Sequence, residues 1–429
     1  MSAILFWLFL ISIPFGFRVL LYQFTPGFHE YESVFLYASD FLMFVFLAVF
    51  FWNQNSYSHI LKNVRIRKSL VFFLVLAAIS VFSASYRILA FYNFVRLALL
   101  ILTALAIGKL LQAGFLKLEK ILAVIAGLAI FESLMGLAQF YYQKSLGLWF
   151  LGESVLGEGV KGIAKIDVEG GSFLRAYGTF PHPNVLAGFL LLGLFSLFYF
   201  WLKNDLWDFK PLAIIKRIFT AVGVYLIALG LLLTFSRTAW FIALFFSLLS
   251  FFYFFINKFY RLQAFYLLII LFSIFYFLFS IFDWAILPRT SINLADPAVS
   301  QRLIYNALGL EIIKNVTDNF FGVGIGNQVI YSVQNNLYRN LGMNESWQWQ
   351  PIHNIYLLIA SEIGIMGLAA FLIFIAGILI LQKNGKLKIE NGILFIMLSA
   401  LLLFGFFDHF LWTLQPGRLM FWLVIGLMI

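Results

Sequence analysis

The 429-residue sequence contains no cysteine, and charged residues make up only 11% of it. The first absence excludes disulfide bonds and thiolate metal sites. The scarcity of charge comes with 63% hydrophobic residues. A soluble chain of this length cannot bury so much apolar surface, whereas a membrane protein that crosses the bilayer many times requires it. The composition therefore indicates a polytopic membrane protein.

Several motifs with a well-defined chemistry are also absent. No G-x-x-x-x-G-K-[ST] sequence occurs, so the protein does not hydrolyse nucleotides through that kind of phosphate loop. Neither H-E-x-x-H nor D-x-D occurs, and we expect no metal and no cofactor. The net charge of +10 does not indicate nucleic-acid binding, because no basic face outside the membrane is large enough.

Twelve apolar runs reach roughly the 20 residues that a helix needs to cross a hydrocarbon layer. We therefore predict an all-α, polytopic membrane protein that forms a single transmembrane helical domain over residues 1–429. The predicted spans lie near 1–22, 33–52, 69–86, 88–110, 119–143, 183–203, 213–233, 237–256, 261–283, 353–381, 390–407 and 412–429.

Lysine and arginine are distributed unequally among the short connections. Sixteen lie after spans two, four, six, eight and ten, and three lie after spans one, three, seven and eleven. Positive residues stay on the cytoplasmic side, so we predict a multi-pass protein of the cytoplasmic (inner) membrane with both termini cytoplasmic. The long connections 144–182 and 284–352 then face outward. An extracytoplasmic active site has no ATP or nucleotide-sugar, so its substrate is one already delivered across the membrane.

The larger outer loop, 284–352, carries structural signals of its own. Asp296 and Pro297 are typical of a helix start. The segment FFGVGIGN (320–327) has no strand before it, so we interpret it as a helix-stop turn and not as a dinucleotide loop. The polar, aromatic segment that follows fits either a lid that stacks on sugar rings or an interfacial aromatic belt. Between these, apolar residues at helical spacing predict an amphipathic helix: Leu303, Ile304, Ala307, Leu308, Ile312, Ile313 and Val316.

Three arginines lie where apolar runs meet the outer connections. Arg237 is on a very short connection, Arg302 is on the predicted amphipathic helix, and Arg175 lies just before span six. The planar guanidinium group binds diphosphate oxygens in a bidentate manner. One such arginine is explained by snorkelling to lipid phosphate. Three of them, with a histidine and on the side poorer in positive charge, favour a pyrophosphate-binding site.

His353 opens the tenth apolar run, two residues after Pro351. Imidazole titrates near neutral pH and can take a proton from a hydroxyl group, although a single histidine at a helix start is more often a capping or packing residue. Glu362 lies nine residues further on and out of phase, so we do not expect it to orient His353. We interpret His182, in PHPN, as part of an ordinary turn into a helix with Pro183 near its first position.

Three further ionisable residues fall within or near the ends of apolar runs: Asp40, Arg96 and Glu132. Such groups are costly in a membrane and are usually paired or functional. A structural ion pair of Arg96 with Asp40 or Glu132 explains them, and so does a proton path. The sequence leaves both interpretations open.

Four segments together resemble the O-antigen ligase and polymerase superfamily of bacterial envelope glycan enzymes. They are RAYGTFPHPNVLAGFL before the sixth run, TFSRTAW between the seventh and eighth, SQRLIYNALGLEIIKNVTDNFFGVGIGN in the large outer loop, and HNIYLLIASEIGIMGL at the start of the tenth. Each motif is loose, but their order and the large loop between spans nine and ten are more specific. The opening 110 or so residues match mainly by hydropathy.

The resemblance implies a function and a set of site residues. Arg237 and Arg302 look like the family's arginines that hold the pyrophosphate of an undecaprenyl-linked glycan, and Arg175 corresponds less securely to further positive charge there. His353 looks like the catalytic histidine. The implied partners are a lipid-linked oligosaccharide donor, a glycan or lipid acceptor such as the lipopolysaccharide core, and membrane lipids. The histidine in PHPN departs from many members, so no catalytic role is assigned to His182.

Two alternatives remain beside a ligase. A repeat-unit polymerase of the same superfamily needs the same donor pocket and differs only in its acceptor, so the sequence does not separate the two. A transporter or flippase of lipid-linked sugars predicts charges spread through the membrane depth, broken helices at the midplane and internal repeats. The candidate charges instead gather at one face, and no repeat is evident.

Overall fold

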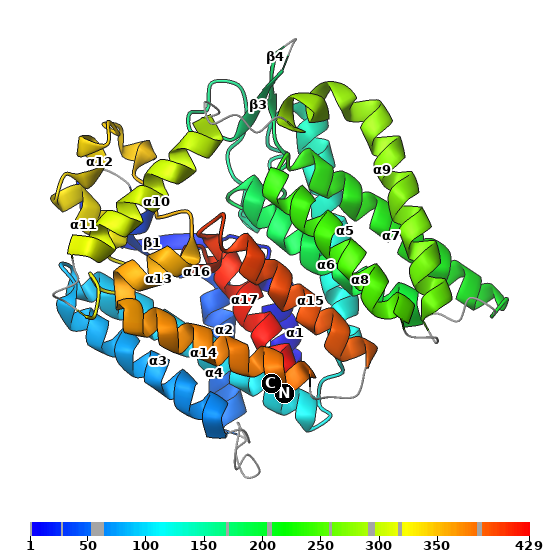
Figure 1. Cartoon of the computed structure of the whole chain (residues 1–429), viewed down its shortest axis with the longest axis horizontal. Coiled ribbons are helices and arrows are strands. Elements are labelled where there is room, and N and C mark those ends of the chain that lie inside the picture. The colour runs from blue at the N-terminus through cyan, green and yellow to red at the C-terminus, as the bar shows by residue number, and fades with distance from the viewer. Residues whose placement is uncertain are drawn as a thin grey trace.

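The computed structural model describes residues 2–26, 29–52, 64–168, 171–203, 208–256, 260–290, 297–315, 320–383 and 388–429. Most of this chain is helical (Figure 1). The helices up to residue 290 are α1 (Ser2–Ser12), α2 (Ala38–Trp52), α3 (Val64–Ser83), α4 (Arg87–Gln112), α5 (Leu118–Tyr142), α6 (Pro183–Lys203), α7 (Pro211–Leu233), α8 (Arg237–Ile256) and α9 (Arg261–Thr290). The later ones are α10 (Pro297–Asn315), α11 (Gln328–Gln334), α12 (Leu337–Asn340), α13 (Ile355–Ile363), α14 (Ile365–Lys383), α15 (Ile389–Phe404), α16 (Phe410–Thr413) and α17 (Gln415–Met428).

Seven helices of the described chain, α3 to α9, contain stretches long and apolar enough to cross a membrane. Four shorter apolar helices accompany them: α1, α2, α14 and α15. The described residues therefore have the architecture of a mainly helical, multi-pass membrane protein. The predicted number of twelve spans is not confirmed. The predicted bounds of 183–203 and 237–256 coincide with α6 and α8.

The first predicted span is wrong. Helix α1 ends at Ser12, because Pro14 has no N–H to donate and disfavours a helical conformation at the residue before it. The chain then forms β1 (Arg18–Gln23), which pairs antiparallel with β2 (Ser33–Tyr37). The second predicted span is consequently helical only from Ala38. A second short hairpin, of β3 (Lys165–Val168) and β4 (Gly171–Leu174), is also present. The fold nevertheless remains mostly helical, which is consistent with the predicted all-α class.

The tenth predicted span, 353–381, is divided into α13 and α14 at Gly364, whose φ is +88°. The outer-loop turn 320–326 packs into this break. The amide of Val323 donates to the carbonyl of Ser361 at 2.9 Å, and the amide of Gly324 donates to that of Glu362 at 2.9 Å. A Cβ on Gly364 would lie 2.0 Å from the carbonyl oxygen of Phe320. The glycine-rich segment is thus a turn that completes the hydrogen bonds of an interrupted helix.

The helix predicted in the large loop is present as α10 and starts at Pro297, as predicted, whereas Asp296 and Val316 lie outside the described residues. Its buried face differs from the predicted one. Tyr305, Leu308 and Ile312 are buried, but Leu303 is 53% exposed. Tyr305 replaces Leu303 because α10 packs against α13 and residues 329–343, and not against the bulk of the bundle.

The two ends of the chain lie on the same side of the molecule. The side-chain amide of Gln112, at the end of α4, donates to the carbonyl of Ile429 at 2.7 Å. Figure 1 shows both termini in the lower half, with the β3–β4 hairpin at the top and α10 to α12 at the upper left. The two long connections therefore share one edge, away from the termini.

Candidate functional site

His353 lies between Pro351 and the start of α13, and its ring is held from two sides. Its Nδ1 atom is 2.9 Å from the carbonyl oxygen of Pro351. The ring of Tyr305, on α10, stacks on it with centroids 4.7 Å apart and planes 9° apart. Asn354 caps α13 by accepting the amide of Tyr356 at 2.9 Å. The turn before the helix therefore fixes the imidazole where α10 crosses α13.

The bond to Pro351 determines the tautomer of His353. A carbonyl oxygen only accepts, so the Nδ1 atom must carry the hydrogen, and in the neutral ring Nε2 keeps its lone pair. Burial lowers the pKa of His353 below its ordinary value, and Arg302 lowers it further, against the opposing charge of Asp408. At neutral pH the ring is therefore uncharged, with an Nε2 atom able to accept a proton.

A second histidine and an aspartate adjoin this ring, and the sequence analysis missed both. His409 meets His353 edge to face, with centroids 4.8 Å apart. Asp408 is only 5% exposed and accepts the side-chain amide of Asn184 at 2.6 Å. Burial raises the pKa of Asp408, but Arg302 and the adjoining imidazoles of His409, His353 and His182 lower it below its usual range. The cluster thus has an ionised carboxylate beside its neutral histidines.

Arg175 reaches the same cluster through Asn184. Its Nη2 atom donates to Oδ1 of Asn184 at 3.1 Å, and its Nε atom donates to the carbonyl of Thr234 at 2.6 Å. Asn184 in turn bonds Asp408, so one hydrogen-bonded chain connects the loop after β4, the start of α6 and the segment before α16.

The structure places the four predicted site residues as follows. The charge of Arg302 acts on His353, and Arg302 and His353 both act on Asp408. Arg302 and His353 therefore lie in one cluster. Arg175 joins that cluster through Asn184. Arg237 begins α8 directly after the turn at Thr234, to which Arg175 is bonded, and its side chain is partly buried. The convergence of Arg237 on His353 stays a prediction.

His182 is the residue before α6, as the turn interpretation predicts, and Pro183 is the first residue of that helix. The amide of Asn184 donates to its Nδ1 atom at 3.1 Å. Burial, and then the charge of Arg175, lowers its pKa to about 3. The charges of His353 and Arg302 also act on it, so this capping residue belongs to the same cluster.

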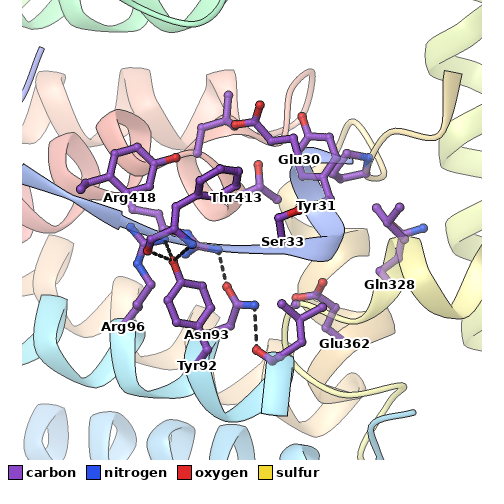
Figure 2. A pocket seen from close by; sticks show the side chains of 17 residues that line it. Glu30, Tyr31, Ser33, Tyr92, Asn93, Arg96, Gln328, Glu362, Thr413 and Arg418 are labelled. Atoms are coloured by element: carbon purple, nitrogen blue, oxygen red, sulfur yellow. Dashed lines mark hydrogen bonds between the residues drawn. The ribbon is translucent and has the colours of Figure 1, made fainter. Parts of the chain in front are cut away.

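A cavity of about 50 Å³ (Figure 2) is lined in part by Pro351, to which His353 is bonded. Thr413 lines it and contacts Nδ1 of His409 at 2.6 Å. Arg96 also lines it and pairs with Asp40 at 3.3 Å, while Figure 2 shows its bond to the hydroxyl of Tyr92. This is the structural ion pair that the sequence left open. The pair joins α2 to α4, and Asp40 also accepts the side-chain amide of Gln415 on α17.

Glu132 does not join that pair. It is fully buried in α5 and accepts the amide of Thr179 at 2.8 Å. It thereby anchors the segment that leads to His182. Among the residues that the structure describes, no group of three or more His, Cys, Asp or Glu side chains is arranged to hold a metal ion.

The comparison with known families agrees with these motifs. Residues 221–372 match the family model described as O-antigen ligase. That segment includes Arg237, Arg302 and His353, and it excludes Arg175 and Asp408. No curated protein matches the chain. The match over residues 221–372 confirms the resemblance of the chain to the O-antigen ligase and polymerase superfamily.

Proposed function

We propose that this protein is a membrane glycosyltransferase. It moves a glycan from an undecaprenyl-pyrophosphate carrier to an acceptor hydroxyl on the outer side of the cytoplasmic membrane. The observation that carries the proposal is the state of His353. Its Nδ1–H is committed to Pro351, its Nε2 atom is available as a base, and Arg302 and Asp408 act on the same ring. The family match over residues 221–372 supports the same class of enzyme.

The proposed reaction needs only these groups and the two substrates. The acceptor oxygen attacks the anomeric carbon, and its proton passes to Nε2 of His353. The bond between that carbon and the diphosphate oxygen breaks, and its electron pair leaves with the diphosphate. Direct attack inverts the anomeric centre. Asp408 then stabilises the imidazolium ion, much as a buried carboxylate does in catalytic triads.

Arginines would stabilise the diphosphate as its charge develops. Arg302 and Arg175 lie in the cluster, and Arg237 follows the turn to which Arg175 is bonded. Fixed donors aimed at developing charge are each worth about 10²–10³ in rate. Because guanidinium groups supply this charge, the reaction as proposed is independent of metal ions.

Reconstituted protein tests the proposal directly. Undecaprenyl-pyrophosphate oligosaccharide and an acceptor are incubated with wild-type protein, with and without EDTA, and the products are separated by size. His353→Gln keeps a polar side chain but has no basic nitrogen, so we expect transfer to fall at least about 10²-fold. EDTA should leave the rate unchanged. A folded His353→Ala protein with full activity would refute the role of His353.

The same assay separates the alternatives. A ladder of products indicates a repeat-unit polymerase, and one-step transfer of preformed chains to a lipid or glycan indicates a ligase. A transporter would move the lipid-linked glycan across liposome membranes without forming a glycosidic product. The gathering of candidate charges near one edge of the bundle favours an enzyme over that third possibility.

A further inference from the structure

His182 occupies a special position at the start of α6, a helix of 21 residues. Its Nδ1 atom accepts the amide of Asn184 at 3.1 Å. A backbone amide can only donate, so Nδ1 must hold a lone pair. In the neutral ring the hydrogen therefore resides on Nε2. His182 and His353 are thus held in opposite tautomers by opposite backbone groups, an amide for one and a carbonyl for the other.

The Nε2 atom of His182 has no hydrogen-bond partner within the described part of the chain, and the side chain is only partly buried. The groups that act on this ring are Arg175, Asp408, His353 and Arg302. The N–H of Nε2 is therefore a fixed donor without a partner in the described fold. Arg302 and Asp408 act on this ring as they do on His353, the proposed base.

We propose that His182 is a catalytic residue that donates its Nε2–H to an oxygen of the diphosphate leaving group. This inference rests on the proposed function and adds a role that the sequence analysis withheld. Burial and the charge of Arg175 keep this donor neutral. The amide of Asn184, which donates to Nδ1, also disfavours a proton on that atom. A neutral imidazole at a helix N-terminus serves as the electrophile in triosephosphate isomerase for the same physical reason.

The neutral state suits a leaving group of this kind. A diphosphate is already a stable anion, so it needs hydrogen bonds and charge but no proton. His353 takes the proton from the acceptor oxygen, and His182 keeps its own throughout, so the two rings do not exchange roles. The hydrogen bond strengthens as charge develops on the diphosphate, so its loss should lower kcat more than it raises KM for the donor.

Two substitutions separate this role from simple capping of α6. His182→Gln can place an amide N–H near the position of Nε2. His182→Asn places its amide near Nδ1, where it caps the helix as well as histidine or better, but it has no donor at the outer position. We expect kcat to fall about 10²-fold for Asn and for His182→Ala, and less than about 10-fold for Gln. If His182 only caps α6, the order of kcat values is different: His182→Asn is fully active and His182→Gln is impaired.

The ¹⁵N NMR spectrum of imidazole-labelled protein in lipid provides a readout that does not depend on turnover. The His182 signals, assigned by their absence from His182→Asn, should show an unprotonated Nδ1 and a protonated Nε2. They should not titrate between pH 5 and 8. Addition of undecaprenyl diphosphate, the proposed leaving group, should shift the Nε2–H signal.

The outcomes are distinct. A protonated Nδ1, a His182 ring that titrates near pH 6.5, an unmoved Nε2–H signal with undecaprenyl diphosphate, or a fully active His182→Asn protein each overturns the inference. If wild-type protein transfers no glycan, the proposed function fails instead, and the tautomer and the response to undecaprenyl diphosphate still report on His182 as a diphosphate ligand.

Discussion

We expect Asn184→Ala to destabilise the protein by about 3 kcal/mol, because this side chain joins two charged groups. Its Oδ1 atom accepts from Nη2 of Arg175 at 3.1 Å, and its Nδ2 atom donates to Oδ2 of Asp408 at 2.6 Å. A hydrogen bond to a charged group contributes about 1.5–3 kcal/mol. Arg175 keeps its bond to Thr234 and Asp408 keeps two backbone amides, so the lower end of the range for two bonds applies.

The free energy of unfolding is measured in mixed micelles by titration with a denaturing detergent. Ser196→Ala on the same helix is the matched control. Ser196 is fully buried, but its hydroxyl donates only to the carbonyl of Leu192 at 2.8 Å within α6. We expect that control to cost less than about 1 kcal/mol, because the bond is local and neutral.

A double-mutant cycle tests the cause of the effect. Asn184→Ala and Asp408→Asn, singly and combined, should give a coupling energy of about 1–3 kcal/mol. Asn184→Asp keeps an acceptor for Arg175 but faces Asp408 with a second carboxylate, so it should destabilise at least as much as alanine. A change below about 0.5 kcal/mol for Asn184→Ala would show that the chain from Arg175 to Asp408 does not hold the site together.

Three further predictions follow from single contacts. A general base must be neutral, and the pKa of His353 is lowered, so kcat/KM should fall only below pH 6.5. Asp408 raises the pKa of His353, so Asp408→Asn should move this fall to lower pH. A fall centred above pH 6.5 would contradict the role of His353 as the base. Arg302→Lys should lower kcat/KM for the donor about 10²-fold, because lysine lacks the guanidinium fork, and Arg302→Gln should lower it further. Wild-type rates in both variants would exclude diphosphate binding by Arg302. Gly364→Ala should destabilise the protein by at least about 1–3 kcal/mol in the same detergent titration, because its φ of +88° and the carbonyl of Phe320 exclude a Cβ; an unchanged midpoint would refute the packing of 320–326 into the helix break.

The helices that the sequence predicts best are those with local start signals. Pro183 and Pro297 mark the first residues of α6 and α10, and the apolar run after Arg237 has the length of α8. In these segments the local signal and the tertiary structure agree. Hydropathy fails over residues 1–22, because β1 is as apolar as a helix, and Val19 to Tyr22 are exposed. Composition cannot distinguish an apolar strand from the continuation of an apolar helix.

The broken helix at Gly364 shows what hydropathy omits. Residues 353–381 form one apolar run, and nothing local requires a break, since glycine is tolerated within helices at modest cost. The break forms because turn 320–326 supplies amides to the carbonyls of Ser361 and Glu362. The interaction depends on chain contacts about 40 residues apart, so a scan of a single sequence window does not detect it.

Some residues of the candidate site are also visible in local motifs, and others are defined only by contacts between distant segments. Arg302 and His353 lie within motifs that the sequence shows, whereas Asp408 has a partner, Asn184, that is 224 residues away. The tetrapeptide Phe407-Asp408-His409-Phe410, at the end of an apolar run, is the only local signal for that carboxylate. An ionisable pair at such a position is a functional candidate by default, and that rule would have found it.

The proposed catalytic groups lie partly inside and partly outside the segment that matches the family model. The matched segment, 221–372, contains the proposed base and two of the proposed diphosphate ligands. Asp408, Asn184 and His182 lie outside it, yet they supply the cluster with its carboxylate, its bridge to Arg175 and its neutral donor. A base needs a partner charge when it becomes protonated, and a leaving group needs donors while it departs. If the proposed reaction is correct, substitutions outside the matched segment should therefore impair catalysis as strongly as those within it.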